Sequence, residues 1–159
     1  MKPITLVVAL YCCTVSLPSF SQAVVATEII DNPAPTVIVN ANCLKHFAKS
    51  FNNSASPRWT ETENGFTAHF SQNETLYDVR YNHKGRWVCT IKYLPIEQLN
   101  KNVARTVYNQ YRDYQIFFAQ QVSVSSGSAY FIKIEKENQW KYLRVVSGAI
   151  EVLGEYVKS

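Results

Sequence analysis

The sequence contains little glycine, little proline and a single methionine. Five Gly and six Pro in 159 residues, spread without a period, exclude a collagen-like or low-complexity chain. Beyond the N-terminus no apolar run approaches the roughly 18 residues of a membrane-spanning helix, which excludes a polytopic membrane protein. A large excess of one charge is also lacking, because 16 Lys+Arg stand against 12 Asp+Glu. This dispersed net charge of +4 does not indicate nucleic acid as a partner.

What the chain does contain is apolar and aromatic surface. Of its residues, 47% are hydrophobic, 13% are aromatic and 18% are charged, in a mass of 18.2 kDa. This composition excludes an intrinsically disordered chain. It suffices to bury a core within one compact domain or within two small repeats.

The N-terminus has the three parts of a secretory signal peptide. Lys2 gives a short positive region, residues 4–15 are apolar, and residues 16–23 are small and polar. Ser21 and Ala23 occupy the two recognition positions for cleavage, and a cut after Ala26 is the alternative. We therefore predict a signal peptide over residues 1–23, an extended lead segment over 24–41, and a location in the periplasm or outside the cell.

Removal of the signal peptide leaves two cysteines, Cys43 and Cys89. An exported protein meets an oxidising compartment, where two thiols can form a disulfide. Strict alternation puts Cys89 on the same strand face as Trp87 and Ile91, where it could meet the apolar side of the first predicted helix. A bond that closes this loop would stabilise the fold by roughly 4 kcal/mol. Two buried free thiols are the other interpretation, and it stays open here.

Two helices are indicated by apolar residues at helical spacing. Asn42 is positioned as the N-cap of the first, and residues 52–54 end it. Pro95 lies near the start of the second, which we expect to continue to about Tyr111. The apolar positions are Cys43, Leu44, Phe47, Ala48 and Phe51 in the first helix, and Leu99, Val103, Val107 and Tyr111 in the second.

Each helix is followed by four short segments of alternating apolar and polar residues, the pattern of strands with one buried face. Turn residues such as Asn64-Gly65 and Ser147-Gly148 separate them. The predicted strands are 57–63, 66–71, 76–81 and 86–93 in the first set, and 115–124, 130–136, 140–146 and 149–157 in the second.

The two sets of strands match each other. Phe66 corresponds to Tyr130 at an offset of 64 residues, and after a turn one residue shorter Gly85 corresponds to Gly148 at 63. A consistent offset predicts a tandem repeat, with units at 42–94 and 95–159. The predicted fold class is therefore α+β: two helix-plus-four-strand units form two layers around an antiparallel sheet whose other face is open and concave.

Aromatic residues and glycines recur at fixed spacings through both units. The motifs are Phe47-x3-Phe51, Trp59, Gly65-Phe66-x-Ala68-x-Phe70, Tyr77-x-Val79-x-Tyr81, Gly85-x-Trp87, Leu94-Pro95 and Tyr111-x-x-Tyr114. This pattern resembles the PepSY-like domains of exported Bacteroidetes proteins, which are related in fold to the beta-lactamase inhibitory protein. The resemblance covers about residues 42–156. It implies a tandem helix-plus-sheet fold and, by analogy of fold, inhibitor-like binding of another protein.

The open face of the second unit carries the candidate binding residues. If Ile132 and its alternating neighbours face the helix, then Phe131, Lys133, Trp140, Tyr142 and Arg144 face the other way. Exposed aromatic residues flanked by Arg and Lys have the composition of protein-interface hot spots. Alternatively, these aromatic residues are cross-strand pairs that stabilise the sheet, or the lead segment covers them.

No catalytic, metal or cofactor motif stands out. His46, His69 and His83 fall on a helix, an outward strand position and a turn, and we interpret each as a solvated histidine. A phosphate loop and a His-Glu-x-x-His motif are lacking. We therefore predict no enzyme activity, no catalytic residue, no metal and no cofactor.

The predicted function is that of an exported binding protein. We expect the aromatic open face to dock another envelope protein, with no nucleic acid partner and no membrane segment after signal removal. The alternative is a small-molecule or envelope-polymer binder that uses a pocket on the sheet. A closed, roomy apolar pocket would favour the alternative, and an open face would favour protein docking.

Overall fold

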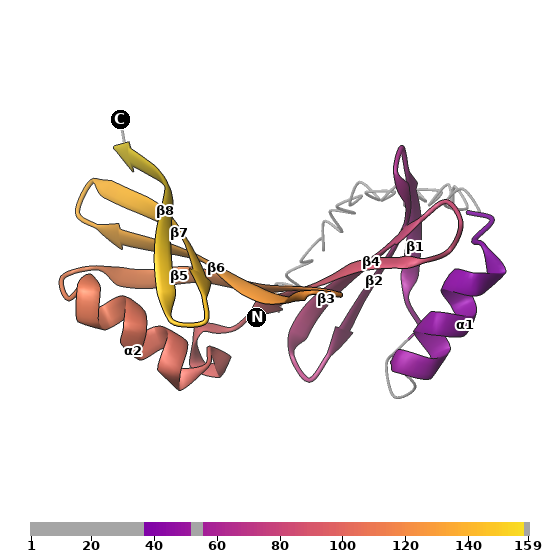
Figure 1. The fold of residues 1–159 in the computed structure, drawn as a ribbon, viewed down its shortest axis with the longest axis horizontal. Coiled ribbons are helices and arrows are strands. Elements are labelled where there is room, and N and C mark those ends of the chain that lie inside the picture. Colours follow the sequence, from indigo (N-terminus) through magenta and orange to yellow (C-terminus); the bar gives the residue numbers. More distant parts are fainter. Residues whose placement is uncertain (1–36, 52–55, 158–159) are drawn as a thin grey trace, which may run out of the picture. The chain divides into compact units, whose positions relative to one another are not determined.

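Eight antiparallel strands follow one another across one sheet, and two helices pack on it (Figure 1). The computed structural model describes residues 37–51 and 56–157, all within the unit Pro35–Ser159. The predicted signal peptide and residues 24–36 of the lead segment lie outside the described residues. No helix in the described part is long and apolar enough to cross a membrane.

The elements follow the predicted order. A helix and four strands occur, then a short 3-10 turn, then a second helix and four strands. Their bounds are α1 (Ala41–Ser50), β1 (Arg58–Thr62), β2 (Gly65–Gln72), β3 (Thr75–Asn82), β4 (Trp87–Leu94), η1 (Ile96–Gln98), α2 (Lys101–Gln110), β5 (Gln115–Val124), β6 (Gly127–Lys136), β7 (Gln139–Val146) and β8 (Ala149–Val157).

Helix α1 buries one side against the first four strands. Its N-cap is Asn40, not Asn42 as predicted, because the Asn40 side chain accepts a hydrogen bond from the Asn42 backbone N–H at 2.9 Å. Cys43 and Phe47 are its buried residues. They pack in a cluster with Phe66, Ala68, Phe70, Val79 and Tyr81.

The second predicted helix is divided in two. Pro95 precedes the turn η1, and Leu99 has an extended backbone with ψ of 135°, so α2 begins only at Lys101. Asn100 fixes this start, because its side chain accepts from the backbone N–H groups of Asn102 at 2.9 Å and Val103 at 3.4 Å. The four-residue spacing of apolar residues continues through Leu99, so the sequence did not predict this break. The cluster under α2 contains Leu99, Val107, Ile116, Ala119, Ile132, Ile134, Leu143 and Val145.

The sheet continues without interruption from the first four strands to the last four. Strand β4 pairs with β5 over five residue pairs, from Thr90–Ser123 to Leu94–Ala119. One row of paired residues runs from the cluster under α1 to the cluster under α2, and it consists of Tyr77, Lys92, Gln121, Tyr130 and Val145. Both helices therefore cover the same face of the sheet.

An α+β fold with an open sheet is thus confirmed. Ile132, Ile134 and Leu143 are fully buried on the helix side, as predicted. The internal duplication, the unit boundaries at 42–94 and 95–159, and the concavity of the open face stay predictions.

Candidate binding surface

The five predicted site residues lie together on the face of the sheet that the helices leave uncovered. Lys133 pairs with Tyr142, and Phe131 pairs with Arg144. Trp140 pairs with Glu135 on the same face. All are partly buried except Arg144, which is exposed. The aromatic side chains therefore cover one another in part, and in part they remain accessible.

Lys133 lies among aromatic rings. Its Nζ is 5.2 Å from the ring centroid of Phe118, 5.4 Å from that of Trp140 and 5.8 Å from that of Tyr142. A cation over an aromatic face gains about 0.5–1 kcal/mol at an exposed site, and more when a partner removes water from it. These contacts hold the ammonium group over β5, β6 and β7 and organise the surface before any partner binds.

Trp140 also stacks on Tyr156 of the edge strand β8. The two rings lie 3.9 Å apart between centroids, with an interplanar angle of 13°. The cross-strand pairing considered from the sequence is therefore present. Tyr156 also leans over Gly154, where a Cβ atom would come within 2.7 Å of the ring. The tyrosine nevertheless remains 47% exposed, so the stacked pair still presents aromatic surface.

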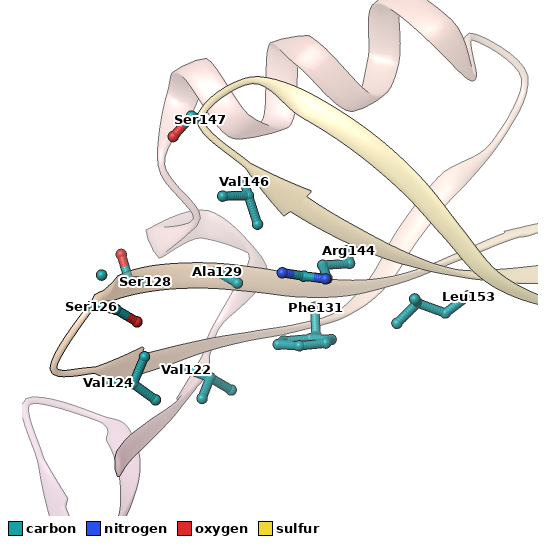
Figure 2. A pocket seen from close by; sticks show the side chains of 11 residues that line it. Val122, Val124, Ser126, Ser128, Ala129, Phe131, Arg144, Val146, Ser147 and Leu153 are labelled. Atoms are coloured by element: carbon teal, nitrogen blue, oxygen red, sulfur yellow. The ribbon is translucent and has the colours of Figure 1, made fainter. Parts of the chain in front are cut away.

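Beside these aromatics lies an apolar groove, shown in Figure 2. Its volume is about 510 Å³, and it is open to solvent. Arg144 borders it and forms an exposed ion pair with Glu151 at 3.1 Å. Such a surface pair contributes only about 0–1 kcal/mol, so a partner can recruit the arginine at little cost. The apolar lining includes Val122, Val124, Phe131, Val146 and Leu153.

Tyr156, Leu153 and the three groove valines, Val122, Val124 and Val146, belong to this surface but are not among the predicted site residues. Leu153 lies at a bulge, because the pairing of β7 with β8 shifts between Tyr142 and Leu143. The alternation of Val122 and Val124 was visible in the sequence. Their neighbours across the strands were not, because register is fixed only in the folded sheet.

A different kind of cluster occupies the open face of the first four strands. His69 Nδ1 donates to Asp78 Oδ1 at 2.6 Å, and its Nε2 lies 2.8 Å from Thr60 Oγ1. The Tyr93 hydroxyl donates to the other Asp78 oxygen at 3.1 Å. Thr60, His69 and Asp78 therefore present a hydroxyl, an imidazole and a carboxylate in the order found in hydrolase triads. This order alone does not identify a triad, because a triad also needs hydrogen-bond donors for the oxyanion. In this sheet the hydrogen bonds fix the orientation of His69 and occupy both oxygens of Asp78.

His83 is exposed, as predicted, whereas His46 and His69 are partly buried, which corrects the prediction that they are solvated. Besides the bonds of His69, His46 Nδ1 lies 3.0 Å from the Tyr81 hydroxyl, under helix α1. His83 Nε2 donates to the Glu63 carbonyl at 2.8 Å. Each histidine pairs with a residue from another element, which sequence spacing alone does not reveal. Among the described residues, no group of three or more His, Cys, Asp or Glu side chains could hold a metal ion.

Both cysteines are free thiols, and Cys43 lies in α1, on the helix side of the sheet. A bulge between Arg80 and Tyr81 in the β3–β4 pairing places Trp87 opposite Tyr81 on the helix side and Cys89 opposite Arg80 on the open side. The expectation that Cys89 shares a face with Trp87 is therefore wrong. Burial raises the pKa of both thiols, which keeps them protonated at neutral pH.

Comparison with solved structures finds this fold in several proteins of Bacteroides. A DUF2874 family protein from Bacteroides ovatus ATCC 8483 is 19% identical, with a TM-score of 0.64 over 77% of this chain and 89% of that chain. A BLIP-like protein from Bacteroides fragilis NCTC 9343 is 13% identical, with the same TM-score and coverage. A candidate periplasmic protein from Bacteroides eggerthii DSM 20697 is 14% identical, with a TM-score of 0.60 over 75% and 88%.

These likenesses show a shared BLIP-like fold and nothing more at such low identity. No family model matches the chain, and no curated protein matches it. The resemblance to the beta-lactamase inhibitory protein is thus supported at the level of the fold. The PepSY-like assignment gains no support from the comparisons.

Proposed function

We propose that the chain is an exported, non-enzymatic binding protein whose open sheet face docks on another protein of the cell envelope. The docking surface is built around Lys133, Trp140 and Tyr142. Phe131 and Arg144 link these residues to the apolar groove. The PepSY-like family and the signal peptide over residues 1–23 belong to the same proposal, which places the protein in the periplasm or outside the cell.

The observation that carries this proposal is the accessible aromatic cluster on the sheet face that neither described helix covers. Trp and Tyr supply large contact area at low entropic cost, and interface hot spots are enriched in Trp, Tyr and Arg. Lys133 is held in place by three rings, so little of its freedom is lost on binding. The BLIP-like fold of a structural neighbour is consistent with inhibitor-like docking.

The open shape of the groove favours a protein over the alternative, a small-molecule or envelope-polymer ligand. Pockets for small molecules bury most of the ligand surface. The groove beside Phe131 and Leu153 opens widely to solvent, so a small ligand in it would keep much of its surface in water. A protein segment that crosses the whole face would cover the groove and the aromatic cluster together.

The test is recovery of partners from envelope extract with immobilised wild-type and variant proteins. Trp140→Ala/Tyr142→Ala removes two anchors, each worth about 2 kcal/mol or about 30-fold in affinity, so at least one partner should be lost. Leu153→Ser weakens the groove without touching the stacked rings and should reduce recovery of the same partner. Tyr108→Ala, on the exposed side of α2, is the control and should recover it fully.

Circular dichroism and thermal unfolding establish that each variant is folded before its recovery is compared. Equal recovery of every partner by wild type and both open-face variants would show that this surface does not dock a partner. Loss of a partner by Tyr108→Ala alone would move the docking surface to the helix side.

A further inference from the structure

The first four strands carry a second cavity on the open face, whose lining adds His69, Asp78 and Arg80 to apolar residues; we call it the polar cavity. Its volume is about 540 Å³. The polar lining comes from strands β1, β2 and β3 and from the turn between β1 and β2. It includes Thr60, Thr62, Asn64, Thr67, His69 and Arg80.

Arg80 lines this cavity, and the oxygens of the neighbouring Asp78 carboxylate bond to other side chains. Asp78 accepts from His69 at one oxygen and from Tyr93 at the other. Among the residues that the structure describes, no salt bridge joins Arg80 to a carboxylate. An exposed guanidinium therefore faces a cavity lined with hydroxyl and amide groups.

The charge of Arg80 also acts on the Cys89 thiol in the wall of the cavity. Cys89 lines the cavity next to Arg80. Burial raises the pKa of its thiol, the positive charge of Arg80 lowers it, and Asp78 raises it by less than Arg80 lowers it. Both charges therefore act at this wall of the cavity, and Arg80 acts on the thiol more strongly than Asp78 does.

We infer that this cavity is a carboxylate-binding site, which takes an acidic side chain of the docking partner. The inference rests on the proposed function. A guanidinium binds a carboxylate through two parallel hydrogen bonds, and the Asn64 amide adds a donor at the same cavity. A singly charged carboxylate fits better than a dianionic phosphate, because the Asp78 carboxylate lines the same cavity and repels added negative charge.

The positions of the cavity and the groove indicate which residue types a partner segment would carry. Thr90 of β4 pairs with Ser123 of β5. Their neighbours Cys89 and Val124 line the polar cavity and the apolar groove, respectively. A segment that crosses this strand pair would place an acidic residue at Arg80 and apolar residues in the groove.

The test titrates isotope-labelled protein with two matched probes, N-acetyl-glutamate amide and N-acetyl-glutamine amide, and follows the NMR signals of the cavity. The acidic probe should shift the amide signals of Asn64 and Thr67 and the Arg80 Nε signal to saturation, and the neutral probe should not. Arg80→Gln should weaken the response at least tenfold, and Arg80→Lys should weaken it less. Arg112→Gln, which removes the same charge after α2, should respond like wild type.

Equal shifts with the two probes, or an unchanged response in Arg80→Gln, would overturn the inference. Tighter saturation by inorganic phosphate than by the acidic probe would overturn the carboxylate class. These spectra also report whether each variant is folded. The titration needs no partner, so its failure would not contradict docking through Trp140 and Tyr142. Failure of the recovery experiment would contradict the docking proposal, and the titration would still test the carboxylate site.

Discussion

Tyr81 connects helix α1 to the sheet at the scale of a single side chain. Its ring is buried, and its hydroxyl forms the 3.0 Å hydrogen bond with His46. Burial raises the pKa of this hydroxyl strongly, and the nearby Cys43 thiol raises it further. Ionisation of Tyr81 is therefore much less favourable in the folded protein than in the unfolded chain.

The protein should lose stability in alkali, and Tyr81 should account for much of the loss. Below the ordinary tyrosine pKa of 10.0 both states are protonated, and the contribution of Tyr81 is fully present. Above it the unfolded chain ionises first, so the free energy of unfolding falls by about 1.4 kcal/mol per pH unit for this group. Urea unfolding from pH 7 to pH 11 measures this slope.

Two variants separate Tyr81 from the rest of the alkaline response. Tyr81→Phe should show a shallower fall above pH 10, even if its stability at pH 7 is lower. Tyr108→Phe, on the exposed side of α2, should keep the wild-type slope. The buried thiols of Cys43 and Cys89 add a smaller loss that begins near their ordinary pKa of 9.0. The same slope in wild type and Tyr81→Phe would contradict the assignment.

At the residue scale, burial was predictable from the sequence and side-chain partners were not. Ile132, Ile134 and Leu143 are buried because alternating apolar residues in a one-sided sheet must face the helices. The contact of His69 with both Asp78 and Thr60 depends on the register of three strands. No local spacing encodes such a register, so the sequence alone predicts a solvated His69.

At the scale of the element, the bulges decide which face a side chain occupies. All eight strands were predicted, yet one extra residue in β4 moves Cys89 to the face opposite Trp87. Similar shifts occur in β5 near Phe117 and in β8 near Leu153. An alternation pattern assumes an unbroken period of two, so it assigns faces wrongly beyond a bulge. The break of the second helix at Leu99 is a comparable local departure from a regular period.

The bulge in β4 leads to a prediction about the thiols. Cys43 and Cys89 should remain unbonded after air oxidation of the folded protein, because the sheet separates them. Alkylation in urea without reductant, followed by peptide mass spectrometry, should modify both residues. Alkylation of the native protein should modify neither quickly, because both are buried. A disulfide-linked peptide pair from the native protein would contradict the placement of Cys89 on the open face.

At the scale of the whole molecule, one continuous sheet carries two unlike surfaces on its uncovered side. The first four strands present the polar cavity at Arg80, and the last four present the aromatic cluster and the groove. The asymmetry between the two sets of strands was visible in the sequence. The hydrogen bonds of the polar half were not visible, because they join side chains of different strands and follow no local motif.

The most direct test of the account places a photo-crosslinker on each side of the sheet. Tyr156 on the open face is 47% exposed and Tyr108 on α2 is 42% exposed, so the two positions are matched in accessibility. Each is replaced by p-benzoylphenylalanine, and the proteins are irradiated in envelope extract. The account predicts discrete protein adducts from position 156 and none from position 108. Adducts from position 108 alone, or the same adducts from both positions, would contradict it.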